Sequence, residues 1–255
     1  MERPLVEAME AYKRGDYRAA FLLFQPLADQ GLPDAQYHLG VMYEMGQGVP
    51  KDYAAGMRLY RKAAEKGSAE AQNKLGVMYY SGLFVEQDFT EALKWYRKAA
   101  EQGLPDAPNN LGLMYKNGHG VPQDYVEAMK WYRKVADQGI AHAQFNLGSM
   151  YYNGLGVPED YPEAMKWYRK AAEQGFPYAQ GVLGLMYSSG KGAPQDDVQA
   201  YMWFSLAISG YPASERDRIE KVKNSRDLAA SRMTPAQIAE AEKLAGEWKP
   251  KPSVS

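Results

Sequence analysis

An internal repeat with a period of 36 residues constrains this sequence more than any other feature does. A Leu-Gly pair marks each copy, and a Tyr follows three residues after each Gly. An Asp also returns in register, and four of the five copies carry an aromatic pair such as Trp95-Tyr96. The repeated pairs are Leu39-Gly40, Leu75-Gly76, Leu111-Gly112, Leu147-Gly148 and Leu183-Gly184, and the Asp residues are Asp52, Asp88, Asp124, Asp160 and Asp196. Periods of this length are typical of proteins that stack one supersecondary unit.

Each copy is predicted to hold two helices joined by a turn rich in Gly and Pro. Helix A of the first copy runs from about Asp34 to Met45, where apolar or small residues recur with helical spacing. Gly40 inside this helix is disfavoured by about 1 kcal/mol relative to Ala, so its return in every copy indicates that two helices approach closely there. Helix B begins at the repeated Asp, which suits an N-cap, and in three copies a Glu three residues later has capping-box spacing.

A single hairpin of this kind cannot bury both of its faces, so the copies are expected to stack into one continuous core. We therefore predict an all-α fold with short, atypical ends. The predicted organisation is a degenerate first hairpin at 1–34, five repeats at 35–70, 71–106, 107–142, 143–178 and 179–214, two capping helices at 215–248, and a disordered tail at 249–255.

Composition excludes several classes of function. Lys and Arg number 30 against 31 Asp and Glu, which leaves a net charge of −1 and no strong field for nucleic acid or an anionic membrane. The absence of Cys excludes disulfides, thiol catalysis and thiolate metal sites. The longest apolar runs are well below the roughly 20 residues of a membrane-spanning helix. We predict no cofactor and no metal site, and we expect a periplasmic or secreted protein if a signal peptide has been removed, and a cytoplasmic one otherwise.

The repeat unit resembles the Sel-one-like repeat (SLR), a relative of the tetratricopeptide repeat. The shared motif, A-x-x-x-L-G-x-x-Y-x-x-G-x-G-V-x-x-D-x-x-x-A-x-x-W-Y-x-K-A-A-x-x-G, is most complete from Ala143 to Gly175, and the match extends firmly over residues 35–214. The resemblance implies a right-handed superhelical solenoid of antiparallel helix pairs. It also implies a scaffold or adaptor role in a family whose members are mostly bacterial and often exported. This chain lacks the Cys residues of a known disulfide-containing branch.

Three positions depart from the repeated pattern. Phe84 replaces the second Gly of the loop between helices A and B, Pro108 replaces a Gln near the start of helix A, and Gly56 replaces an Ala of helix B. These departures predict local irregularity in copies one to three without loss of the fold.

The resemblance also places helix A along a concave groove, where the positions next to each Leu-Gly pair vary between copies. Asn side chains there can donate to and accept from a peptide backbone, Lys can hold a carboxylate, and Tyr can supply anchoring area. The alternative is that these are ordinary solvated residues. The candidate groove residues are Tyr37, Asn73, Lys74, Tyr80, Asn109, Asn110, Lys116, Phe145, Asn146 and Tyr152. We predict a non-catalytic scaffold that binds a protein or peptide, and that is monomeric or weakly self-associating through the solenoid ends.

Alternative functions receive less support from the sequence. An exported factor that binds a host or cell-envelope partner stays open. Rows of basic residues on helix B, such as Lys94, Arg97 and Lys98, suggest nucleic acid or membrane, but interleaved Glu residues favour a solvated face. Some relatives are linked to β-lactam recognition, and Ser188 and Lys191 have S-x-x-K spacing. No companion S-D-N or K-T-G motif accompanies that pair, so a weak hydrolase is disfavoured.

Overall fold

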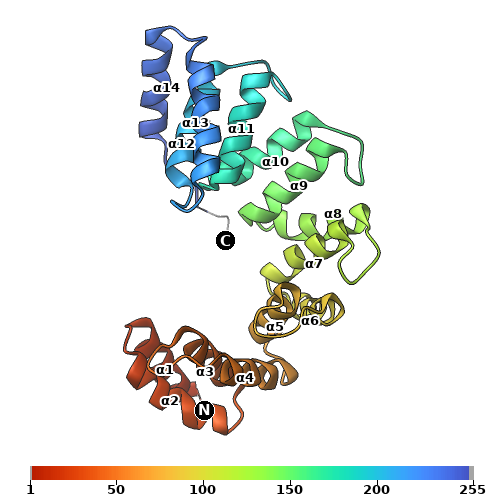
Figure 1. The fold of residues 1–255 in the computed structure, drawn as a ribbon, viewed down its shortest axis with the longest axis vertical. Helices are drawn as coiled ribbons and strands as arrows, with labels where there is room; N and C mark the ends of the chain where they lie inside the picture. Colours follow the sequence, from red (N-terminus) through yellow and green to blue (C-terminus); the bar gives the residue numbers. More distant parts are fainter. Residues whose placement is uncertain (1, 253–255) are drawn as a thin grey trace. The chain divides into compact units, whose positions relative to one another are not determined.

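A computed structural model describes residues 2–252, and these residues form fourteen α-helices without a strand (Figure 1). The all-α fold class predicted from the sequence is confirmed. The chain divides into two compact units between Gln123 and Asp124. This division falls inside the third predicted copy, between its two helices.

The helices of each unit follow one another as antiparallel pairs, and successive helices pack together from α1 to α7 and from α8 to α13. The first unit contains α1 (Glu2–Lys13), α2 (Tyr17–Asp29), α3 (Pro33–Met45), α4 (Tyr53–Glu65), α5 (Ala69–Ser81), α6 (Phe89–Glu101) and α7 (Asp106–Asn117). The second contains α8 (Tyr125–Ala136), α9 (Ala141–Asn153), α10 (Tyr161–Glu173), α11 (Pro177–Ser189), α12 (Asp197–Gly210), α13 (Arg216–Ala230) and α14 (Pro235–Glu247). Helix A of the five copies is therefore α3, α5, α7, α9 and α11, and α1 holds the corresponding place in the first hairpin.

The repeated Asp is the N-cap of every helix B, as predicted, but the capping box is not completed there. In α10 the Asp160 carboxylate accepts a hydrogen bond of 2.8 Å from the Glu163 backbone N–H. The Asp160 backbone N–H donates to the Tyr151 carbonyl oxygen of α9 at 2.9 Å, so it is already satisfied. The Glu163 side chain instead accepts from Lys166 at 2.8 Å. A complete capping box forms at α14, where Thr234 is the N-cap.

In four of the Leu-Gly pairs, at Gly40, Gly76, Gly148 and Gly184, the Gly lies against an aromatic ring of helix B, which confirms the close approach predicted from the sequence. An ideal Cβ on Gly76 would lie 2.5 Å from two carbons of the Tyr96 ring. On Gly148 it would lie 3.0 Å from the nearest carbon of Tyr168. Any side chain at these positions would push the ring, and with it helix B, away from helix A.

Buried Gln side chains join four of the five copies to the hairpin before them. The fourth residue of α3, α5, α9 and α11 is a Gln that donates from its Nε2 to a carbonyl oxygen in the last turn of the preceding helix B, where intrahelical donors are lacking. These bonds run from Gln36 to Ala28 (3.1 Å), Gln72 to Ala64 (3.0 Å), Gln144 to Ala136 (3.1 Å) and Gln180 to Ala172 (3.2 Å). Pro108 stands at the equivalent position of the repeat in α7 and has no side-chain donor.

Phe84 and Gly56 each have a local structural explanation. Phe84 has a φ of 64°, the left-handed conformation that Gly adopts in the other loops. Its ring stacks on Tyr53 with a centroid distance of 3.7 Å and an interplanar angle of 14°. An ideal Cβ on Gly56 would lie 3.0 Å from the Gly40 carbonyl oxygen, so this replacement brings α3 and α4 close together.

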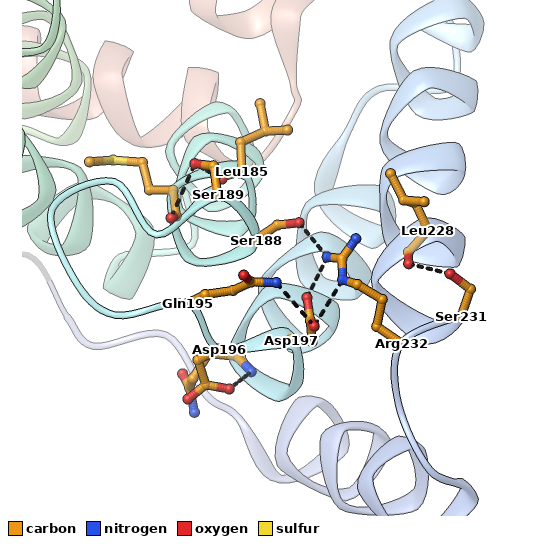
Figure 2. Close-up of polar contacts among 11 residues, drawn as sticks. Leu185, Ser188, Ser189, Gln195, Asp196, Asp197, Leu228, Ser231 and Arg232 are labelled. Atoms are coloured by element: carbon orange, nitrogen blue, oxygen red, sulfur yellow. Dashed lines mark hydrogen bonds and ion pairs between the residues drawn. The ribbon is translucent and has the colours of Figure 1, made fainter.

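The C-terminal helices α13 and α14 both pack on α12. Arg232, in the turn between them, binds Asp197 at the start of α12 and donates to the Ser188 hydroxyl of α11 at 2.9 Å (Figure 2). Beyond α14, the Lys251 backbone N–H donates to the Glu173 carbonyl oxygen at 2.7 Å, and its ammonium pairs with the Glu173 carboxylate at 2.8 Å. Of the predicted tail, residues 253–255 lie outside the described residues.

Candidate functional site

The ten groove residues predicted from the sequence are all half-buried on A helices. We call the surface that they form the A face of each unit. The first unit carries Tyr37, Asn73, Lys74, Tyr80, Asn109, Asn110 and Lys116, and the second carries Phe145, Asn146 and Tyr152. Half-burial means that these side chains both contact the fold and remain partly accessible.

Polar side chains of the A face connect neighbouring A helices in the first unit. The Asn110 amide of α7 donates to the Asn73 side-chain oxygen of α5 at 3.0 Å. The Lys74 ammonium of α5 pairs with the Glu44 carboxylate of α3 at 2.8 Å. The carboxylate that pairs with Lys74 is therefore supplied by the chain itself. The Tyr60 hydroxyl also donates to Glu44, at 2.6 Å.

Two of the three Tyr residues of the A face, Tyr80 and Tyr152, contact residues of the loop in the next copy. The Tyr80 hydroxyl lies 3.1 Å from Nδ1 of His119, whose ring stacks on Phe89 at 4.3 Å. In the second unit the Lys191 ammonium donates to the Tyr152 hydroxyl at 3.4 Å. Both Tyr rings are thus held in place, and each retains a partly exposed surface.

Phe145 and Lys116 differ in how they are placed. Phe145 packs in an aromatic cluster, with ring centroids 5.4 Å from Tyr168 and 5.5 Å from Phe176. It therefore stabilises the pairing of α9 with its neighbours. Lys116 has no ion-pair partner for its ammonium among residues 2–252.

A pocket of about 430 Å³ opens on the A face of the first unit. Residues of three successive A helices, α1, α3 and α5, line it. Its lining residues are Leu5 and Met9 from α1, Asp34, Tyr37 and His38 from α3, and Glu70 from α5. Tyr37 is the one residue of the pocket that the groove prediction named.

The rings of the pocket are partly desolvated and lie in a negative field. Burial lowers the pKa of His38, while the charges of Asp34 and Glu70 oppose that shift. Burial also raises the pKa of Tyr37, and the carboxylates of Glu70 and Glu44 raise it further. His38 stacks on the buried Phe24 ring at 5.3 Å, so its position is fixed by the core. The pocket therefore combines an apolar wall with two carboxylates at its mouth.

A sequence signal for this pocket exists at the start of the A helices. The first turn of α3, α5 and α7 holds Asp34, Glu70 and Asp106, which are spaced 36 residues apart. The corresponding positions of the later copies hold His142 and Tyr178. Carboxylates also suit the first turn of any helix, so this pattern alone does not indicate a site.

The basic rows of helix B are occupied by contacts within the fold. Lys94, Lys130 and Lys166 pair with Glu residues three positions earlier at 2.8–2.9 Å, as the solvated-face interpretation predicts. The Arg of each row instead donates to the Tyr hydroxyl of the next helix A, which the sequence analysis did not anticipate. These pairs are Arg61–Tyr79, Arg97–Tyr115, Arg133–Tyr151 and Arg169–Tyr187.

The S-x-x-K pair does not form the arrangement that a serine hydrolase needs. The Ser188 hydroxyl accepts from Arg232, whereas the Lys191 ammonium is bound by the hydroxyls of Tyr152 and Tyr161 (Figure 2 for Ser188). These hydrogen bonds raise the pKa of Lys191, whereas a lysine acting as general base requires a lowered pKa. No group of three or more His, Asp or Glu residues within 2–252 is placed to hold a metal ion.

The Sel1 repeat family model matches six segments of the chain, at residues 11–32, 33–68, 69–104, 105–140, 141–176 and 177–210. The chain belongs to the Sel1 repeat family. The first matched segment lies within the degenerate first hairpin predicted at 1–34. Sel1 repeat proteins are generally non-catalytic scaffolds for protein interaction. None of the helices in the described part is both long and apolar enough to span a bilayer.

Solved structures of this family resemble the chain along most of its length. A Sel1 repeat protein from Oxalobacter formigenes is 30% identical, with a TM-score of 0.76 over 96% of this chain and 99% of that protein. A protective antigen of uropathogenic Escherichia coli strains is 31% identical, with a TM-score of 0.59 over 94% of this chain and 59% of the antigen. A curated rat protein, DAP3-binding cell death enhancer 1, is 50% identical over 42 residues, which are 16% of this chain and 8% of that protein.

Proposed function

We propose that this chain is a non-catalytic scaffold that binds a protein or peptide segment on the A face. The observation that carries the proposal is the pocket lined by Leu5, Met9, Tyr37 and their neighbours, because it is built from three different A helices. Side chains that come together only when repeats stack are the means by which repeat proteins form extended binding surfaces. The half-buried polar residues along α5 and α7 continue this surface with groups that can pair with a peptide backbone.

The opposite surface supports binding less well. Lys94, Lys130 and Lys166 on that surface are paired with nearby Glu, and its Arg residues donate to Tyr hydroxyls of the next copy. A partner on that side would have to break contacts that already satisfy the charged groups, and it would gain little in exchange.

A photocrosslinking experiment tests the proposal. A peptide library is first panned against the full chain, and the enriched peptides are synthesised. A benzoylphenylalanine is then placed at Tyr37 or Lys116 on the A face, or at Lys94 on α6 as the matched control. We expect the enriched peptides to crosslink from the first two positions and not from Lys94. Equal crosslinking from Lys94, or no enrichment of any peptide, would count against an A-face binding site.

A second candidate keeps the same surface but places the protein outside the cytoplasm, where it meets a host or cell-envelope partner. The similarity to the uropathogenic antigen favours this version. Fractionation of cells that express the natural gene, with detection by an antibody to this chain, separates the two: a periplasmic or secreted pool supports export, and a wholly cytoplasmic pool contradicts it.

A further inference from the structure

We infer that the pocket of the first unit binds a cationic side chain, Lys or Arg, of a peptide that lies along the A face. This inference rests on the proposed function and adds the chemistry of the partner. It starts from the walls of the pocket, where Leu5 and Met9 pack against the core of the first hairpin and remain only partly buried. With the Tyr37 ring they form an apolar channel that suits the methylene stem of a long basic side chain.

The mouth of the pocket supplies the complementary charge. Asp34 and Glu70 are both exposed there, and both act on the same imidazole of His38. Asp34 has no basic partner among the described residues, and Glu70 accepts one long hydrogen bond, of 3.3 Å, from the neutral Ser68 hydroxyl. The two carboxylates beside the apolar wall therefore have no Lys or Arg partner in the described part of the chain.

The basic side chains of the surrounding helices do not fill this role. Helix α3 contains no Lys or Arg, and Lys74, the basic residue of α5, is paired with Glu44. On α1, Arg3 pairs with Glu7 at 3.7 Å. Lys13 lies one turn beyond Met9 and does not line the pocket. The negative charge at the mouth is therefore not neutralised by these helices.

The size of the pocket agrees with this ligand. A volume of about 430 Å³ lies within the usual range of ligand pockets, about 300–1,000 Å³, and exceeds what a single methyl or water would occupy. A carboxylate ligand would be repelled by Asp34 and Glu70, and a purely apolar one would gain nothing from these two charges. Asp106 extends the row of carboxylates one copy further, so a second basic residue on the peptide would find a partner on α7.

The test is an NMR titration of the full chain carrying a ¹³C-labelled methyl on each Met. The probe is the peptide acetyl-Ala-Ala-Arg-Ala-Ala-amide, and the neutral comparison replaces Arg by norleucine. We expect the Met9 methyl signal to shift in a saturable manner with the Arg probe, with at least about fivefold weaker binding of the neutral one. Raising the salt concentration should weaken binding of the Arg probe alone, because the ion pairs are screened.

Two double variants make the test specific. Asp34→Asn with Glu70→Gln removes the charges with little change in shape, and it should weaken the Arg probe about fivefold or more, as two partly exposed ion pairs would. Glu101→Gln with Asp137→Asn removes two exposed carboxylates elsewhere and should leave binding unchanged. The inference is overturned if the Met9 methyl signal does not shift with the Arg probe, or if the Asp34/Glu70 double variant binds the Arg probe with the same affinity as the unsubstituted chain. If crosslinking from Tyr37 persists in that case, only the ligand chemistry is wrong; if both fail, the proposed function fails too.

Discussion

The Gly at the centre of helix A offers the sharpest test of the packing. Replacing Gly76 by Ala would normally stabilise a helix by about 1 kcal/mol. Here the new Cβ would lie 2.5 Å from Cδ1 and Cε1 of Tyr96, whereas carbon atoms prefer about 3.5–4.0 Å. The Tyr96 ring is 3% exposed and would have to move by about 1 Å inside a packed core. Overpacking of this kind costs about 1–3 kcal/mol, and a buried ring at so short a distance belongs to the upper half of that range.

The gain of about 1 kcal/mol in helix propensity offsets part of this overpacking cost. We therefore expect Gly76→Ala to lower the free energy of unfolding by about 1–2 kcal/mol, measured by guanidinium denaturation with circular dichroism. Gly246→Ala in α14 is the matched control, because no side chain or backbone atom from outside its own stretch of helix lies within 4 Å of its ideal Cβ. That change should stabilise the chain by up to about 1 kcal/mol. In a Tyr96→Leu background, Gly76→Ala should lose most of its destabilising effect, which assigns the energy to the ring. Stabilisation by both Ala substitutions would refute the close-packing explanation of the repeated Gly.

Three further outcomes follow from local contacts. Asp160→Ala should lower the free energy of unfolding by about 1 kcal/mol in denaturation experiments, because α10 loses its N-cap, and an unchanged midpoint would contradict that role. Arg232 lowers the pKa of Asp197. The difference in unfolding free energy between the unsubstituted chain and Asp197→Asn should therefore be constant above about pH 5 and should disappear as the pH falls through the lowered pKa. A difference that is independent of pH down to about pH 2 would exclude the ion pair. Phe84→Gly should change the free energy of unfolding by less than about 0.5 kcal/mol, because relief of the left-handed backbone strain offsets the loss of the ring stack. Gly156→Ala should destabilise the chain by more than about 1 kcal/mol. The reverse order of stabilities in thermal melts would contradict the loop geometry.

The local features of the fold were predictable because their causes lie within one helical turn. The helix pairs, the Asp N-caps and the Gly-rich turns follow from residues three or four positions apart, which a sequence displays directly. The packing role of Gly40 and its equivalents was also predictable, since an unfavourable residue that returns in every copy needs a reason outside its own helix. The second hydrogen bond of the capping box, from the N-cap backbone N–H to the Glu side chain, was wrongly predicted. That N–H donates instead to a carbonyl oxygen of helix A, which no local sequence pattern reveals.

The candidate site shows the opposite balance. The sequence by itself distinguished the positions of helix A that vary between copies, including Tyr37, from the repeated positions that form the core. It did not pair Lys74 with Glu44, 30 residues away, and it did not join Leu5, Asp34 and Glu70 around one pocket. Those associations depend on the offset between stacked hairpins. A period fixes how often a contact recurs, but the shapes of the packed side chains set that offset, so only the tertiary structure decides which residues from successive copies meet.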